Sequence, residues 1–210
     1  MATRYLALLR GINVGTHGRI HMDALRHMIE DAGFTRVETY IQSGNVLFDS
    51  DLSEQSARQA LERALREQTG IETTAVLRMS AELNRLVDGC PFSAEQIAAA
   101  EAAGEGERLF VCLLTRPPSA EALAALPEAD AEGDQFAISG REIYLLLRQS
   151  IRNSQLAGRL QRAFPDATVR GWTTMIKLRT LLSPQDALSY QTPQPNSGVI
   201  PRKQAEGRHS

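Results

Sequence analysis

Hydrophobic residues in the first half of the chain switch between the spacing of strands and the spacing of helices. Residues 5–9 form a continuous apolar run, which predicts a strand buried on both faces. Apolar positions at 22, 25, 29 and 32 then recur at helical spacing, and Gly33 ends the pattern as a C-terminal glycine does. Residues 37–48 alternate around a Ser-Gly-Asn turn and predict a β-hairpin. After the hairpin, the first half of the chain is expected to form a helix at 53–68, a strand at 73–77 and a helix at 80–87.

The second half repeats this order of elements. We expect strands at 109–115, 135–139, 142–147 and 167–170, and helices near 120–126, 155–164 and 173–182. The repeat predicts an α+β fold of two duplicated ferredoxin-like (βαββαβ) halves, each followed by an extra helix. The expected domains are a first half at 1–90, a connector at 91–106, a second half at 107–183 and a flexible tail at 184–210.

This topology predicts which loops meet. In a βαββαβ unit the third strand lies next to the first, and the loop after the first strand lies at the same end as the hairpin between the second and third. The glycine-containing segments 10–19 and 42–45 should therefore lie side by side. The continuous apolar runs at 109–114 and 143–147 also imply that both faces of the second sheet are covered.

Composition limits the classes of protein to which the chain can belong. Hydrophobic residues make up 42% of its 210 residues, enough for a packed core. The longest apolar stretches are far shorter than the roughly 18 residues of a membrane-spanning helix, and no charged-then-apolar leader opens the chain. We therefore expect a soluble, cytoplasmic protein with no membrane partner. Two cysteines, Cys90 and Cys112, are too few for a disulfide framework or a four-cysteine zinc site, so we expect buried thiols.

Charge is balanced overall but unevenly distributed. The formal net charge is −2, which gives no general argument for nucleic acid as a partner. Residues 82–134 carry eleven acidic and three basic residues, whereas residues 141–179 carry eight basic and two acidic ones. Solvated helix faces that partly neutralise one another explain this pattern. The basic segment leaves nucleic-acid binding open as an alternative, although residues 45–48 and 109–112 do not match the RNA-recognition signature.

The loop at residues 10–19 is the first candidate for chemistry. It follows a strand and precedes a helix, where backbone N–H groups and the helix dipole can hold an anion. Its glycine spacing matches neither a P-loop nor a dinucleotide-binding loop, so it names no cofactor. Alternatively, the glycines only permit positive φ angles in a long connection. The candidate ligand-binding residues of this loop and of the adjacent hairpin are Arg10, Gly11, Asn13, Gly15, Gln42, Ser43 and Asn45.

A possible second region surrounds the only tryptophan, at the last strand-to-helix junction. Trp172 either anchors the core or stacks on a ligand beside Arg170 and Lys177, and Thr173 is the expected N-cap of the helix. His17 and His21 have metal-ligand spacing, but Gly18 lies between them and we expect no metal site. No set of residues for nucleophilic catalysis stands out.

Several of these segments together resemble an uncharacterised bacterial family, domain of unknown function 1697 (DUF1697). They are residues 7–15 (ALLRGINVG), Ile20 with Met22, residues 39–46 (TYIQSGNV) and residues 168–178. The resemblance covers about residues 4–183 and implies duplicated α+β halves, but no activity. The family tends to have a second glycine where this chain has Thr16, lysines near His17 and His21, and an asparagine where Gly171 stands. Lysines there fit a basic loop better than a metal site.

The sequence thus favours a protein that binds a small phosphate- or carboxylate-bearing ligand at the 10–19 loop and the 42–45 hairpin. These residues determine neither whether it is an enzyme nor which cofactor it uses. One alternative is a non-catalytic structural or protein-interaction scaffold, in which the glycines and asparagines only shape tight turns. The other is nucleic-acid binding through the basic second half.

Overall fold

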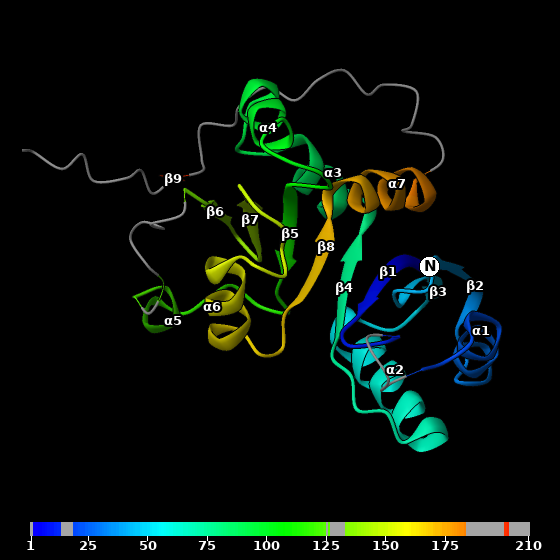
Figure 1. Cartoon of the computed structure of the whole chain (residues 1–210). Coiled ribbons are helices and arrows are strands. Elements are labelled where there is room, and N and C mark those ends of the chain that lie inside the picture. The colour runs from blue at the N-terminus through cyan, green and yellow to red at the C-terminus, as the bar shows by residue number, and fades with distance from the viewer. Residues whose placement is uncertain (1, 14–18, 125, 127–132, 184–199, 202–210) are drawn as a thin grey trace, which may run out of the picture. The chain divides into compact units, whose positions relative to one another are not determined.

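The computed structural model describes residues 2–13, 19–124, 126, 133–183 and 200–201 (Figure 1). The chain divides into two compact units, of which the first comprises Met1–Arg85 with Ile176–Tyr190 and the second Leu86–Met175 with Gln191–Ser210. Both divisions fall inside helices, namely α3 (Ser80–Asp88) and α7 (Trp172–Leu182). Within the described ranges, no helix combines the length and the apolar character needed to cross a membrane.

The first unit contains a four-stranded antiparallel sheet in the order β2-β3-β1-β4. Its elements are β1 (Thr3–Leu9), α1 (Met22–Asp31), β2 (Thr35–Tyr40), β3 (Asn45–Ser50), α2 (Glu54–Thr69) and β4 (Ala75–Met79). As expected, the third strand pairs with the first, with Tyr5 opposite Phe48 and Leu8 opposite Asn45. This register brings the end of β1 beside the β2–β3 turn.

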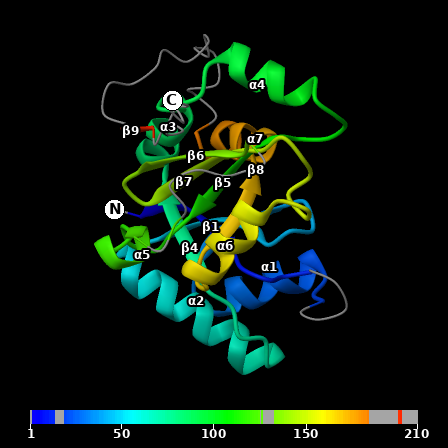
Figure 2. The same cartoon turned by 60° about the vertical axis from the view of Figure 1, so that its left-hand side comes forward.

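One face of this sheet packs against α1 and α2, which Figures 1 and 2 show on the same side of it. Apolar side chains at helical spacing, Leu25 and Ile29 on α1 and Leu61 and Leu65 on α2, are fully buried there. The serine predicted to open the second helix is confirmed as its N-cap, since the Ser53 hydroxyl accepts from the Ser56 N–H at 3.3 Å. The amphipathic spacing of apolar residues therefore determines which side of each helix packs against the sheet.

The second unit contains an antiparallel sheet in the order β8-β5-β7-β6-β9. Its described elements are α4 (Ala94–Glu101), β5 (Leu109–Leu113), α5 (Ala120–Ala124), β6 (Gln135–Ser139), β7 (Glu142–Leu146), α6 (Gln155–Ala163), β8 (Thr168–Gly171) and β9 (Ile200–Pro201). The core includes Cys112, Leu145 and, from α6, Leu156 and Leu160. Helix α4 lies within the stretch expected as a connector, and β9 lies within the stretch expected as a tail.

Strands β5 and β7 are buried on both faces, which confirms the expectation from their continuous apolar runs. Cys112 and Leu145 belong to the core that α6 covers. Val111 and Tyr144, whose side chains alternate with these along the strands, are no more than 1% exposed. Alternation along a strand places neighbouring side chains on opposite faces, so both faces exclude water.

Both thiols should resist alkylation in the folded protein. Burial raises the pKa of Cys112 to about 12 and raises that of Cys90 as well. A raised pKa favours the neutral thiol, so these groups stabilise the fold below their ordinary pKa and lose that contribution as the pH rises toward the folded value. We expect iodoacetamide at pH 8 to modify neither cysteine in native protein, and both in denaturant, as measured by mass spectrometry. Fast alkylation of native protein would contradict this.

Candidate functional site

The loop after β1 and the β2–β3 turn meet at one end of the first sheet, as the topology predicted. The Leu9 N–H donates to the Gly44 carbonyl at 2.8 Å. On the other side of the loop, the Arg10 N–H donates to the Thr74 carbonyl at 3.0 Å, and the Thr73 hydroxyl donates to the Arg10 carbonyl at 2.7 Å. The start of the loop is therefore held from both sides by the sheet's own connections.

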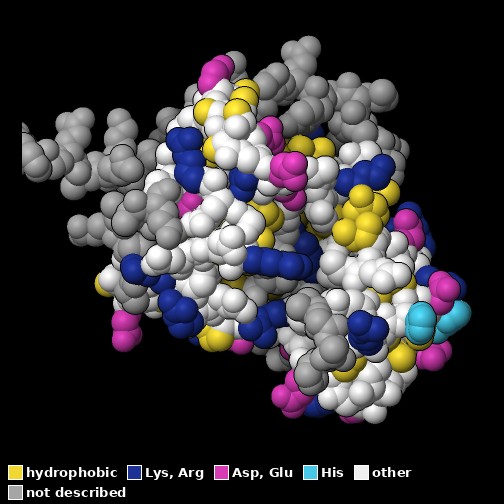
Figure 3. Space-filling view, viewed as in Figure 1, with side chains coloured by type: hydrophobic (Ala, Val, Ile, Leu, Met, Phe, Trp, Pro, Cys, Tyr) yellow, Lys and Arg dark blue, Asp and Glu magenta, His cyan; other side chains and the backbone are white. Residues whose placement is uncertain are grey.

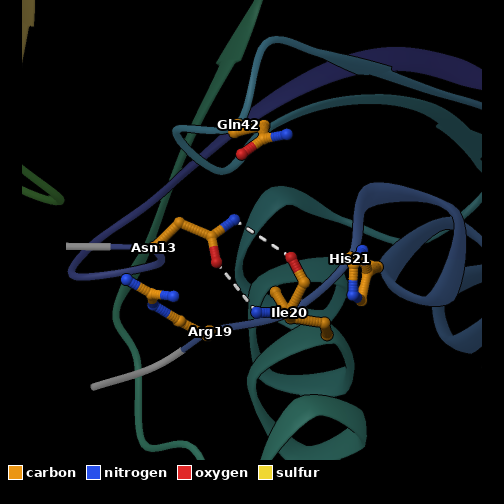
Figure 4. Close-up of a pocket in the computed structure, with 5 residues that line it drawn as sticks. All are labelled: Asn13, Arg19, Ile20, His21 and Gln42. Atoms are coloured by element: carbon orange, nitrogen blue, oxygen red, sulfur yellow. Dashed lines mark hydrogen bonds between the residues drawn. The ribbon is translucent and has the colours of Figure 1, made fainter. Parts of the chain in front are cut away.

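Asn13 closes this loop with its side chain. Its Nδ2 donates to the Ile20 carbonyl at 3.0 Å, and the Ile20 N–H donates to its Oδ1 at 2.8 Å (Figure 4). Asn13 has a φ of 57°, in the left-handed region that asparagine tolerates better than most residues. Ile20 in turn packs against the core of the first unit. Asn13 thus anchors the far end of the loop, and both ends of its amide are used within the protein.

A pocket of about 390 Å³ opens at this place, and the described residues that line it are Asn13, Arg19, Ile20, His21 and Gln42 (Figure 4). Arg19 and His21 flank the residue that Asn13 holds. His21 is the N-cap of α1 and makes no side-chain capping hydrogen bond, so the first N–H groups of α1 are left without a capping side chain from it. Gln42 comes from the hairpin, and Figure 4 shows it on a separate segment from the other four.

The hairpin turn is built around two buried positions. Gly44 is buried with a φ of 70°, and a Cβ there would lie 3.0 Å from the Cβ atoms of both Leu9 and Ile12. Asn45 is fully buried, and its Nδ2 donates to the Tyr40 carbonyl at 3.1 Å and to the Ser43 hydroxyl at 2.8 Å. The Asn45 hydrogen bonds stabilise the turn that carries the lining residue Gln42, and the Leu9 N–H to Gly44 carbonyl bond holds this turn against β1.

The predicted ligand-binding residues therefore have different positions relative to the pocket. Asn13 and Gln42 line the pocket. Gly11, with a φ of 72°, permits the turn out of β1, whereas Arg10 is half-buried and is not among the described lining residues. Gly15 lies outside the described residues, as does His17.

Two lining residues, Arg19 and His21, were missed as ligand-binding candidates. Arg19 belonged to the quoted loop, and its charge was the available signal. His21 was weighed only as a metal ligand, although its place directly before the first apolar residue of a helix marked it as a helix start. Among the described residues, no group of three or more histidine, cysteine, aspartate or glutamate side chains is placed to hold a metal ion.

The three residues of the possible second region lie on β8 and α7. Trp172 packs against Tyr144, with ring centroids 6.4 Å apart, in the second unit. The half-buried Arg170 donates to the Thr168 hydroxyl at 2.7 Å, and its burial lowers the pKa of its guanidinium to about 10, so it stays charged at neutral pH. Lys177 is exposed and lies in the part of α7 that belongs to the first unit. Trp172 therefore has an aromatic packing contact within its own unit and is half-buried.

The expected N-cap at Thr173 is wrong, because α7 already begins at Trp172. The Thr173 N–H instead donates to Oε1 of Glu107 at 2.6 Å. Glu107 belongs to a segment that is distant along the chain. A Cβ at Gly171 would overlap this carboxylate. The absence of a side chain at position 171 therefore leaves room for Glu107 to cap the helix.

On the face shown in Figure 3, both basic and acidic side chains lie at the surface of the described residues. This mixture accords with solvated helix faces as the source of the uneven charge along the chain.

Comparison with known proteins supports the fold and names a family. The chain is similar to the conserved bacterial protein SP0830 from Streptococcus pneumoniae, with a TM-score of 0.65 and 21% sequence identity, over 87% of this chain and 100% of that chain. No curated protein matches the chain. The family model described as "Protein of unknown function (DUF1697)" matches residues 2–144. The resemblance seen in the sequence is thereby confirmed, and the chain belongs to the DUF1697 family.

Proposed function

We propose that the first unit binds a small phosphate- or carboxylate-bearing ligand in the pocket between the β1–α1 loop and the β2–β3 turn. One observation carries the proposal: the pocket of about 390 Å³ brings Arg19 together with His21, the N-cap of α1, whose side chain makes no capping hydrogen bond. Among its described lining residues there is no aspartate or glutamate. Asp23, in the first turn of α1, is exposed and is not one of them.

The lining supplies several kinds of donor to an anion. A guanidinium such as that of Arg19 can form two parallel hydrogen bonds to a carboxylate or phosphate. The first N–H groups of α1 carry the positive end of the helix dipole, and the Gln42 amide adds neutral donors from the opposite segment. Such a mixture of charged and neutral donors suits an anionic group on a larger polar molecule.

The scaffold alternative is favoured by a different observation. The amides of Asn13 and Asn45, which the sequence offered as ligand contacts, donate to groups of the loop and of the hairpin themselves. If the pocket has no ligand, these residues serve only to shape tight turns. The binding experiment below separates the two functions.

We also propose that both units are ferredoxin-like and arose by duplication. The strand order β2-β3-β1-β4 in the first unit corresponds to β6-β7-β5-β8 in the second, which supports this relation. A cytoplasmic location is part of the same proposal, and it is supported by the two free, buried thiols.

Removing the charge of Arg19 should abolish most of the binding. We expect inorganic phosphate, citrate or AMP to raise the melting temperature of the wild-type protein and to give a binding isotherm in titration calorimetry. Arg19→Ala should weaken that binding at least about tenfold, because one charge-assisted contact contributes about 1.4 kcal/mol or more.

The matched control is Arg63→Ala, an exposed arginine on α2 that does not line the pocket. It should bind the same probes as wild type. Equal binding by wild type and Arg19→Ala would refute the proposed site. A lack of response to all three probes would favour the scaffold alternative.

A further inference from the structure

A second pocket, of about 540 Å³, lies in the second unit between the loop after β5 and the connection from α6 to β8. We propose that it binds a small zwitterion with an apolar body, the chemistry of a free apolar amino acid. The proposal concerns residues of the second unit only and does not depend on the anion site of the first.

Like the pocket of the first unit, this pocket lies beside the loop after the unit's first strand, but its other wall is the α6–β8 connection and not the hairpin. Leu113, at the end of β5, pairs with both Glu142 of β7 and Thr168 of β8, so the loop that follows sits at the edge where β8 begins. The Leu114 N–H donates to the Arg141 carbonyl at 2.9 Å, as the Leu9 N–H does to the Gly44 carbonyl in the first unit. The end of the first strand is therefore a concave place in both units, but the lining residues differ completely.

Both walls of the second pocket carry apolar side chains among their polar ones. Pro117 and Pro118 come from one segment, and Phe164 and Pro165 from the other, over the buried Leu114. Proline fixes φ, and Arg141 Nη1 holds the first segment by donating to the Thr115 carbonyl at 3.2 Å. A pocket whose walls are preset loses little entropy when a ligand enters, and its apolar surface suits an aliphatic or aromatic group.

Two opposite charges line the same pocket without neutralising each other. Arg116 lies on the first segment and Asp166 on the second. No ion pair joins them to each other or to another described residue. Both residues are exposed. A ligand with only one charge would pair with one of these groups, whereas a zwitterion would pair with both.

Each of the two charged side chains lies near a second group that favours the same charge on the ligand. Near Asp166, α6 ends at Ala163, and the C-terminal end of a helix favours a cation such as an ammonium group. On the segment of Arg116, the Ser119 hydroxyl accepts from the Ala122 N–H at 3.1 Å, which leaves its O–H free to donate to a carboxylate. The pocket thus has an end for an ammonium, an end for a carboxylate and apolar walls between.

The test compares one amino acid with analogues that lack one charge. Titration calorimetry of the full chain would use L-phenylalanine and L-leucine, then 2-phenylethylamine, which lacks the carboxylate, and 3-phenylpropanoate, which lacks the ammonium. We expect at least one of the two amino acids to bind. If L-phenylalanine binds, each analogue should bind at least about tenfold more weakly, a loss of roughly 1.4 kcal/mol.

Variants then assign each charge of the ligand. Arg116→Ala should weaken binding of the amino acid at least about tenfold but leave 2-phenylethylamine unchanged, and Asp166→Asn should weaken the amino acid but leave 3-phenylpropanoate unchanged. Arg152→Ala, an exposed arginine of the same unit outside the pocket, is the control and should bind as wild type. The proposal is overturned if neither amino acid binds at millimolar concentration, if the analogues bind as well as the amino acid, or if the two variants bind like the control.

Discussion

Gly44→Ala should lower the free energy of unfolding by about 2–5 kcal/mol, the largest effect that we expect from a single methyl group in this protein. Two costs add. A non-glycine residue at a φ of 70° is strained by roughly 1–2 kcal/mol. The new Cβ would also lie 3.0 Å from the Cβ atoms of Leu9 and Ile12, both buried, and overpacking of this kind costs about 1–3 kcal/mol. Urea denaturation followed by circular dichroism measures the change.

Gly11→Ala separates the two costs. Gly11 has nearly the same φ, 72°, but a Cβ there meets nothing within 4 Å. It should therefore show the backbone cost alone, about 1–2 kcal/mol. If the two variants were equally stable, the close approach of the hairpin to the β1 loop would not be present in solution.

Asn13→Ala should lower the free energy of unfolding by about 2–4 kcal/mol, because it removes two hydrogen bonds and leaves alanine in the left-handed region. The same variant should weaken anion binding, even though the Asn13 amide is used within the protein. Its side chain holds Ile20, and Ile20 lies between the two lining residues Arg19 and His21. Thermal denaturation and titration with inorganic phosphate measure the two effects on one sample.

Asn13→Gly is the matched control, since glycine accepts a φ of 57° and only the hydrogen bonds are lost. It should recover part of the stability lost in the alanine variant, but should still bind phosphate weakly. An alanine variant that binds phosphate like wild type would show that the loop does not need Asn13 to present Arg19.

These outcomes bear on how the anion site is built. The hairpin and the loop contribute to it mainly through backbone geometry, with Gly44 and Asn45 on one side and Gly11 and Asn13 on the other. Among the described lining residues, Arg19 is the side chain with a permanent positive charge. Stability and binding should therefore change together at Asn13, and separately at Arg19.

The sequence by itself was sufficient for most of the helices and strands, with α4 and β9 as exceptions. Apolar spacing in a helix or strand reflects which side of that element is buried, and this is a local property that the chain carries at each position. Leu25 with Ile29 on α1 and Leu61 with Leu65 on α2 were expected to face inward, and all four are fully buried. The element order also predicted that the β1 loop would meet the hairpin, since few topologies are compatible with it.

Only the tertiary structure decided what the polar side chains do. Asn13 and Asn45 read as ligand contacts, because an amide can bond to a ligand or to its own backbone and the sequence does not distinguish them. The cap of α7 was missed because its carboxylate, Glu107, comes from 66 residues away along the chain. Arg116 and Asp166 likewise come from two separate segments that line one pocket. Such partners are chosen by contacts between distant segments, which periodicity along the chain does not encode.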